Sequence, residues 1–466
     1  MIDELYKIKE HMPDIQIKEI TFGINKLILI NIETVSSSTL SNQYIMDYLS
    51  KRSLLKNKFS SIKKDLINYI PSINFSSITK DELFKYLFNG FTALIYIDEI
   101  YVFETKSILD RGINVPISEP TIKGPKDSFN ENYNTNIGLI RKRIKDINLY
   151  MEEFTLGKKT NTKICVMYMN DIVDKELLEY ATNKIKKIDT DKILDTYYIK
   201  ELIKNENKTN FPTIKSTEKP DTIAKALLDG KICVLSENSN SVLIIPTFFI
   251  DFFYVEEDNY QKKPYAVFVK ILRLFAFFIT IFLPSIYLSL ITYDQQILPT
   301  DLLINFSLQK ASVPFPAIIE AIILILTFEL LYEADATTPT SRGTSLSILG
   351  ALVLGDAAVS AGIISPIMVI VIAMTAISSI FFIYHEFQSF IRISRYSLMV
   401  LASLFGIVGI LFGFVFIVCN LCSIESFNKP FLFPISPMIN KSKSYLIKHG
   451  LSVQSTDKGD LWKKLL

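Results

Sequence analysis

The C-terminal part of the chain, from Tyr265 to Ile424, carries few charged residues and consists of long apolar runs. A helix needs about 20 mostly apolar residues to cross a bilayer. Several of the runs reach that length. The sequence therefore predicts an all-α transmembrane helical domain over residues 263–424.

Four apolar segments define the expected membrane crossings. They are Leu274–Ile291, Val313–Glu333, Gly343–Tyr384 and Leu398–Leu421. The third is long enough for two crossings, over residues 344–361 and 367–382. The total is five if 344–361 spans the bilayer and four if it re-enters. Five are favoured because they place Arg392 and Arg395 on the cytoplasmic side, although they send the polar tail to the other side.

The second segment, VPFPAIIEAIILILTFELLYEA, is apolar and yet contains three glutamates. Glu320 lies well inside the run, whereas Glu329 and Glu333 lie toward an end expected in the headgroup region. At about 100° per residue, Glu320 and Thr327 share one helix face, and the other two glutamates lie on roughly the opposite side. An ionisable group inside lipid indicates a buried partner or a water-filled path. These four residues are the candidate intramembrane polar sites.

A face of small residues is predicted on the helix over 344–361. Its members are Ser347, Ala351, Gly355, Ala358 and Gly362. Small residues let helices approach closely in lipid. Asp356 projects away from this face, and a charge at mid-depth costs about 2.5–3.5 kcal/mol if it meets lipid. The small face and Asp356 are therefore candidates for helix packing or for lining a pore.

Four prolines are expected to kink or break helices of this domain. They are Pro284, Pro314, Pro316 and Pro366. Pro284 lies inside the first segment and removes a backbone hydrogen bond to the Thr280 carbonyl. Pro366 follows Ser365 and opens the next helix.

Two pairs of segments repeat within the soluble part. A strand, a polar turn and a helical pattern occur in Lys26–Leu49 and in Lys163–Ile185. An amphipathic helix, a glycine and two strands occur in Asp81–Thr105 and in Asp221–Phe249. In the second pair, Gly90 and Gly230 end the helix because glycine accepts positive φ. The hydrophobic period then changes from helical to alternating.

These repeats predict an α+β soluble N-terminal region made of two similar α/β subdomains. The expected order is a first subdomain over 1–112, a linker over 113–159, a second subdomain over 160–262, the membrane domain, and a polar C-terminal tail over 425–466. The linker contains a basic helix pattern, Ile137–Ile147. This helix is either a solvated connection or a docking surface for an acidic partner or lipid headgroups.

Composition and motifs exclude several classes of function. The net charge of +2 argues against nucleic-acid binding. Phosphate loops, dinucleotide fingerprints and HExxH motifs do not occur in the sequence. Cys419 and Cys422 stand without a second cysteine pair, so a zinc site is not expected. The chain is therefore predicted not to be an enzyme and to use no metal or cofactor.

The residues before the first crossing indicate the orientation of the chain. The cations there are Lys262, Lys263, Lys270 and Arg273. They predict a cytoplasmic soluble region, because basic residues stay on the cytoplasmic side. The residues after Met1 are charged and do not predict a secretory signal. The acidic run Glu256-Glu257-Asp258 is expected to be a solvated turn.

Several short segments of this sequence, taken in their order along the chain, resemble segments of a known protein family. The membrane part contains LPSIYLSLITY, ILPTDLL, VPFPAIIEA, LTFELLYEA and LGALVLGDAAVSAGIISPIMVIVIAMTAISS. The soluble part contains IKGPKDSFNENYNTNIGLIRKRI, FPTIKSTEKPDTIAKALLDG and IIPTFFIDFF. In these words the chain resembles the A subunit of the GerA family of spore germination receptors, of the GerA, GerB and GerK type. Departures from the family pattern occur at Tyr332-Glu-Ala-Asp335 and at TTPTSRGTSLSI.

The resemblance implies a subunit of a nutrient germinant receptor in the inner membrane of bacterial spores. It implies a transporter-like B subunit and a lipoprotein C subunit as partners, and a homo-oligomer that forms an ion-conducting path. Two alternatives stay open. One is a transporter component that moves a solute, with Glu320 and Asp356 as proton or cation sites. The other is a scaffold that only assembles partner subunits.

Overall fold

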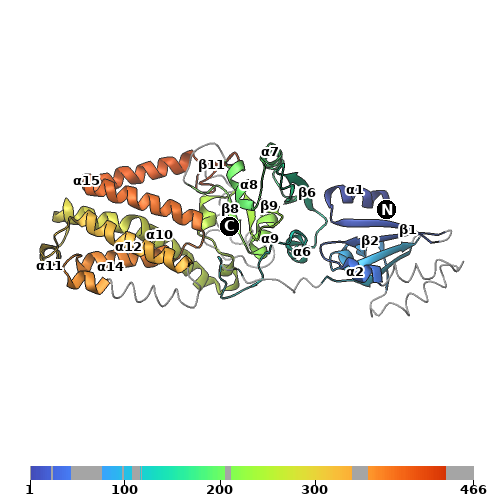
Figure 1. Ribbon diagram of the computed structural model, residues 1–466, viewed down its shortest axis with the longest axis horizontal. Coiled ribbons are helices and arrows are strands. Elements are labelled where there is room, and N and C mark those ends of the chain that lie inside the picture. The colour runs from blue at the N-terminus through green and yellow to red at the C-terminus, as the bar shows by residue number, and fades with distance from the viewer. Residues whose placement is uncertain are drawn as a thin grey trace, which may run out of the picture. The chain divides into compact units, whose positions relative to one another are not determined.

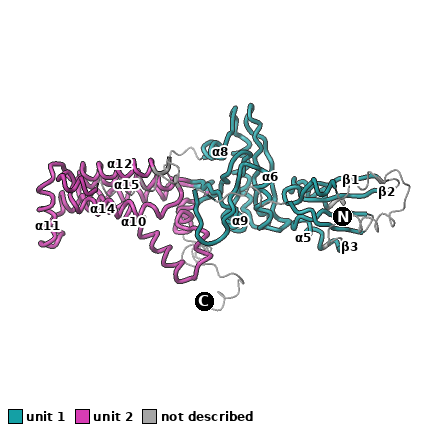
Figure 2. The backbone as a smooth tube through the Cα atoms, turned by 60° about the horizontal axis from the view of Figure 1, so that its bottom comes forward, with its two compact units in different colours: residues 1–206, 213–247, 426–428 teal, residues 207–212, 248–425, 429–466 magenta. Residues whose placement is uncertain are grey.

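The computed structural model describes residues 2–22, 25–43, 76–96, 99–107, 116, 118–204, 211–337 and 355–436. These residues form two compact units (Figure 2). The sheet-rich unit contains the described residues up to 204, together with 213–247 and 426–428. The helical unit contains the described residues among 211–212, 248–425 and 429–436.

The first part of the sheet-rich unit is a five-stranded antiparallel sheet with strand order β1-β2-β4-β5-β3. Its strands are β1 (Ile15–Phe22), β2 (Asn25–Ile32), β3 (Ser76–Ile78), β4 (Phe91–Tyr96) and β5 (Glu99–Glu104). Its helices are α1 (Ile2–His11), α2 (Ser38–Ser41), η2 (Lys80–Glu82) and α5 (Leu83–Leu87). Alternate β2 residues such as Ile28 and Ile30 share a core with Leu5 of α1 and Leu87 of α5, because side chains alternate between the two faces of a strand.

The second part is another five-stranded antiparallel sheet, with strand order β6-β7-β9-β10-β8. Its strands are β6 (Leu149–Leu156), β7 (Thr162–Met169), β8 (Lys215–Thr217), β9 (Ile232–Ser236) and β10 (Val242–Ile245). Its helices are α6 (Tyr133–Arg143), α7 (Lys175–Lys186), α8 (Thr196–Ile203) and α9 (Pro220–Leu228). Helices α6 and α9 cover one face, with Cys165 and Cys233 in the core beneath them. Helices α7 and α8 cover the other face.

The two sheets share one topology, since each runs in the order first, second, fourth, fifth and third strand. Gly90 and Gly230 occupy equivalent places after α5 and α9, and both have φ +81°. The predicted fold of two similar subdomains followed by a helical region is confirmed. The strand pairs of the two five-stranded sheets are antiparallel in the described residues. Strand β6 and helix α6, which lie in the expected linker 113–159, belong to the second subdomain.

The helical unit is built from apolar helices. Its elements are η3 (Phe249–Phe252), η4 (Glu256–Tyr260), α10 (Lys263–Thr292), η5 (Gln295–Ile297), α11 (Thr300–Ala311), α12 (Ala317–Thr337), α14 (Pro366–Ser379), α15 (His385–Ser423), β11 (Glu425–Ser426) and β12 (Lys429–Pro430). Among the described residues, two helices are long and apolar enough to cross a bilayer, Lys263–Thr292 and Glu386–Ser423. Helix α14 is also apolar but has 14 residues. Helix α12 begins at Ala317, four residues after the start of the expected segment Val313–Glu333.

Helix α15 is interrupted at Gly406, which has φ 61° and ψ −143°. This conformation is open almost only to glycine. A side chain on Gly413 would overlap Leu398, although the two residues would lie about 22 Å apart along a straight helix. The chain therefore reverses at Gly406 and runs back along itself (Figure 1). Residues 385–405 and 407–423 form a helical hairpin.

The expected segment Leu398–Leu421 is therefore not one continuous helix, because it contains the break at Gly406. Asp294, in the turn after α10, accepts a hydrogen bond from the Ile407 amide at 2.9 Å. That bond caps the second arm, because a helix start leaves backbone N–H groups without intrahelical partners. Gly413 gives the arms room to pack. The helix break at Gly406 is thus stabilised by Asp294, which follows a different helix, α10. Sequence patterns around Gly406 do not reveal this distant partner.

The chain that follows the hairpin rejoins the sheet-rich unit. The Ser426 hydroxyl donates to the Thr213 carbonyl at 2.8 Å and accepts from the Thr247 amide at 3.1 Å. The ring of Phe427 packs edge-on against Tyr180 of α7. Residues 426–428 are thus an integral part of the soluble fold.

Candidate functional site

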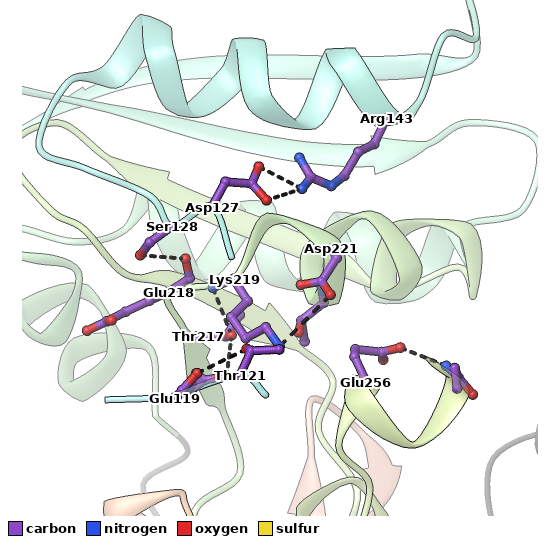
Figure 3. Close-up of polar contacts among 12 residues, drawn as sticks. Glu119, Thr121, Asp127, Ser128, Arg143, Thr217, Glu218, Lys219, Asp221 and Glu256 are labelled. Carbon is purple, nitrogen blue, oxygen red and sulfur yellow. Dashed lines mark hydrogen bonds and ion pairs between the residues drawn. The ribbon is translucent and has the colours of Figure 1, made fainter. Parts of the chain in front are cut away.

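A buried polar cluster in the second subdomain joins the segment before α6 to β8 and α9 (Figure 3). The Thr217 hydroxyl donates to Glu119 Oε2 at 3.0 Å. The Phe129 amide donates to the Glu218 carbonyl at 2.9 Å, and the Lys219 ammonium lies 3.9 Å from Asp221. Two of the sequence words that carry the family resemblance, IKGPKDSF and IKSTEKPD, therefore pack against each other.

Glu119 is the most enclosed carboxylate of this cluster, with 8% of the residue exposed. Burial raises its pKa, and the nearby Lys215 and the hydrogen bond from Thr217 oppose that effect. The cluster is closed by neighbouring side chains. We assign it a structural role in holding the segment before α6 onto the sheet.

The basic helix α6 turns its arginines inward. Arg141 is fully buried and makes two hydrogen bonds to Asp14, from Nε at 3.2 Å and from Nη2 at 3.1 Å. Arg143 pairs with Asp127 at 2.6 Å (Figure 3). Because Asp14 precedes β1, the first of these pairs joins the two subdomains. These two arginines therefore serve internal ion pairs, whereas Lys142 and Lys145 of the same basic run are exposed. A docking role for these two lysines stays a prediction.

The acidic turn at residues 256–258, before the first long helix, also contains buried carboxylates. Asp258 in η4 has a side chain that is 1% exposed, and it binds Arg273 of α10 through contacts of 2.6 and 3.0 Å. The Lys270 ammonium lies 4.8 Å from the centre of the Tyr254 ring. The expected solvated turn at 256–258 is wrong, because the carboxylate of Asp258 meets a cation carried by the helix that follows it.

Aromatic rings hold the same segment to the bundle. Phe252 of η3 stacks on Phe387 of α15 with ring centres 4.8 Å apart. Phe253 meets Phe277 of α10 edge-on at 5.3 Å and also contacts Phe382. The segment that enters the first long helix is thus fixed to α10 and to the start of α15.

Glu320, the carboxylate deepest in the second apolar run, is bound on two sides. It is 1% exposed, and its Oε2 accepts hydrogen bonds from the Ser365 amide at 3.1 Å and hydroxyl at 3.0 Å. Its Oε1 lies 3.5 Å from the Lys310 ammonium of α11. Glu320 therefore links α11 and α12 to the start of α14. A buried carboxylate is tolerated when it is paired in this way.

The other polar residues of α12 have separate surroundings. Glu329 lies 2.9 Å from Arg395 and 4.0 Å from Arg392, both on the first arm of α15. The Thr327 hydroxyl donates to its own helix at the Ile323 carbonyl, so it does not join Glu320. Glu333 is exposed near the end of the helix. Glu320 and Glu329 therefore each form an ion pair, with partners on different helices.

The small face is described only in part. Ser347 and Ala351 lie outside the described residues, and residues 355–360 are helical. Ala358 packs against the helical core, whereas a side chain on Gly355 would meet no described atom within 4 Å. Gly362 has φ +66°, so it serves a turn rather than helix packing. Asp356 is exposed.

The prolines lie mostly at helix ends. Pro314 and Pro316 precede α12, and Pro366 is at the start of α14 after its N-cap Ser365. Pro284 lies within α10, which continues past it. Three of the four prolines therefore separate helices, as expected from the missing amide hydrogen of proline.

The model of the Bacillus/Clostridium GerA spore germination protein family matches residues 3–458. The chain belongs to the GerA family. Among its relatives, spore germination protein KA of Bacillus subtilis is 37% identical over 360 residues, which are 77% of this chain and 66% of that protein. Spore germination protein B1 of Bacillus subtilis is 32% identical over 440 residues, 93% of this chain and 90% of that protein. The chain thus spans about two thirds of the length of protein KA.

A solved structure is also similar to part of this GerA-family chain. It is the N-terminal domain of the A subunit of the Bacillus megaterium spore germinant receptor GerK3, which is 27% identical, with a TM-score of 0.40. The match covers 53% of this chain and 95% of that domain. The resemblance drawn from the sequence words is confirmed by the family match.

Sequence reasoning misses several partners in this GerA-family chain. Lys310 and Ser365, which bind Glu320, are not among its candidates. Arg395, which binds Glu329, enters only as an indicator of orientation. A cation close to an apolar run is the signal that points to Lys310 and Arg395, whereas Ser365 carries no distinctive pattern.

Proposed function

We propose that this GerA-family chain is a subunit of a nutrient germinant receptor in the inner membrane of the spore. In this proposal it crosses the membrane several times and oligomerises through its membrane helices. The helices then form an ion-conducting path that opens when a germinant is sensed. A transporter-like B subunit and a lipoprotein C subunit are its proposed partners.

The exposed carboxylate of Asp356 carries the proposal for an ion path. It lies six residues before Gly362, where an added β-carbon would lie 3.3 Å from the carbonyl oxygen of Ser312 at the end of α11. Asp356 belongs to the helical residues 355–360, which end just before this turn. A carboxylate costs about 2.5–3.5 kcal/mol when it meets lipid at mid-depth. Asp356 is therefore expected to contact water or a second subunit rather than lipid. A ring of such carboxylates around a pore selects cations.

Reconstitution tests this path. The full chain in liposomes is expected to conduct monovalent cations, and Asp356→Asn is expected to lower the cation flux roughly fivefold because it removes the charge that attracts cations. The flux is measured with a potassium-sensitive dye. Asp301→Asn, which removes an exposed carboxylate of α11, serves as the control and should conduct normally. Absence of flux from every oligomeric form of the wild-type chain would exclude conduction and favour the scaffold.

Gly355 tests the oligomer separately. A β-carbon there would meet no described atom within 4 Å, so we expect Gly355→Leu to leave the protomer folded. Overpacking at a contact between subunits costs about 1–3 kcal/mol, which shifts the assembly toward smaller species. Light scattering after size-exclusion chromatography measures the shift. Ser360→Leu, at an exposed position about 140° around the helix, is the matched control. Equal masses for the two variants would argue against the small face as an interface.

The hairpin supports a particular membrane topology. Its two arms run about 30 Å and about 25 Å, which is close to the thickness of the hydrocarbon core. We propose that they cross and return, so that the tail lies on the same side as the soluble region. Lys262 and Lys263 are exposed at the start of α10, which supports a cytoplasmic position for that side.

The transporter alternative is less favoured by the structure. It needs Glu320 as an exchangeable proton or cation site, and Glu320 is enclosed by Lys310 and Ser365. If the same liposomes took up protons together with a solute, the transporter function would be supported instead.

A further inference from the structure

A pocket opens where α12, α14 and the first arm of α15 meet. Its polar lining consists of Glu329, Tyr332, Ser379, Gln388, Arg392 and Arg395. Phe328, Ile380 and Ile391 supply the apolar part of the wall. All three helices belong to the helical unit. The pocket lies outside the Glu320 site and away from Asp356.

The buried arginine of this pocket, Arg395, has a side-chain N–H group without a hydrogen-bond acceptor in the described part of the chain. The side chain of Arg395 is 5% exposed, and its Nη2 binds Glu329 Oε1 at 2.9 Å. Its Nε has no hydrogen-bond partner among the described residues, and the guanidinium lies 5.5 Å from the centre of the Tyr396 ring, whose hydroxyl also interacts with it. A buried donor without a partner costs about 1–3 kcal/mol. An oxygen acceptor that enters the pocket would remove that cost.

The second arginine adds charge at the mouth of the pocket. Arg392 has a side chain that is 36% exposed, and its Nε lies 4.0 Å from Glu329. Its guanidinium rests over the Tyr332 ring at 5.2 Å. Two guanidinium groups therefore share one carboxylate among the residues that line the pocket. The lining has a surplus positive charge and favours an anion.

The position of the pocket indicates where the anion comes from. The pocket is at the C-terminal end of α14, next to Phe382 and Phe387, and these rings pack on Phe277 one turn after Arg273 of α10. It therefore lies on the side of the N-terminal half of α10 (Lys263–Thr292). Ile377 and Ile380 of α14 are 62% and 64% exposed beside it. A charged pocket with an apolar flank suits a molecule that has both a phosphate and an acyl chain.

We propose that this pocket binds the phosphate of an anionic phospholipid headgroup, with the acyl chains along α14. Arginine suits this role because its planar guanidinium presents several donors to phosphate oxygens. Basic pockets between membrane helices bind lipid headgroups in the same way. The inference rests on the proposed membrane location and not on ion conduction. Loss of lipid binding with intact cation flux would leave the proposed receptor function standing.

Native mass spectrometry of the full chain in a neutral detergent tests the proposal. Phosphatidylglycerol is titrated against phosphatidylcholine. The wild-type chain is expected to bind phosphatidylglycerol at least about fivefold more tightly, since one arginine near a lipid charge contributes about that factor. Arg392→Gln should remove most of this preference while it leaves the Arg395–Glu329 pair intact. Ser379→Leu fills the pocket without a change of charge and should weaken the binding of both lipids.

Two controls decide the outcome. Lys263→Gln removes an exposed cation at the start of α10 and should change the affinity for phosphatidylglycerol by less than about twofold. An equal loss in Lys263→Gln and Arg392→Gln would show diffuse attraction and overturn the site. Unchanged affinity in both Arg392→Gln and Ser379→Leu would overturn it as well. Inorganic phosphate is added at millimolar concentration as a competitor. If it displaces phosphatidylglycerol as well as added phosphatidylglycerol does, the pocket binds free phosphate and the lipid proposal is overturned.

Discussion

Replacement of Gly406 by valine is expected to destroy the C-terminal helical hairpin. A β-carbon at this position would lie 2.7 Å from the Asp294 carboxylate and 3.0 Å from Tyr293. The backbone has φ 61° and ψ −143°, which costs a residue with a side chain about 1–3 kcal/mol before these clashes are added. We expect the membrane-inserted yield to fall several-fold, and the remaining chain to extend as one long helix.

Fluorescent and phosphatase reporters at the C-terminus measure the result. In the wild-type chain the reporter is expected on the same side as the soluble region, because residues 426–428 belong to that fold. Leu404→Val, at an exposed helical position of the first arm, is the control and should behave as wild type. A valine variant with normal yield and an unchanged reporter side would contradict the hairpin. Asp294→Ala should give a milder loss of about 1 kcal/mol, the value of one cap.

Removal of Arg141 is expected to cause the largest loss of stability in the soluble region. Its side chain is fully buried, and it binds Asp14 twice and the Leu149 carbonyl once. Arg141→Leu leaves the Asp14 carboxylate buried without its cation, which costs about 3–5 kcal/mol. For a region of this size that corresponds to a fall in Tm of roughly 10 °C. The double variant with Asp14→Asn should recover much of the loss, because no charge is then left unpaired.

The buried thiols of Cys165 and Cys233 report this unfolding. With the exposed Cys419 and Cys422 changed to serine, a thiol-reactive dye follows only the soluble region of the full chain. Arg143→Leu is the matched control, since its pair with Asp127 is partly exposed and such pairs contribute about 1 kcal/mol or less. If Arg141→Leu melts at the same temperature as Arg143→Leu, the pair does not hold the subdomains together.

The fold of the soluble region follows largely from local signals. The repeat is visible because each half contains a helix, a glycine and a strand in the same order, and Gly90 and Gly230 indeed share one backbone conformation. Strand β6 is missed for a local reason too. Its last residues alternate between half-buried and exposed, as expected at a sheet edge, and such a pattern resembles a polar connection.

The apolar runs by themselves determined that a helical region follows two similar sheet subdomains, and the family words determined the GerA assignment. Only the tertiary structure decided which charges meet. Glu320 stands out in the sequence, but Ser365 and Lys310 reach it only after α11, α12 and α14 have packed. Likewise, the reversal at Gly406 depends on Asp294. Hydrophobic period and glycine stops act within a turn or two of the chain, whereas the pairing of buried polar groups depends on which distant segments the fold brings together.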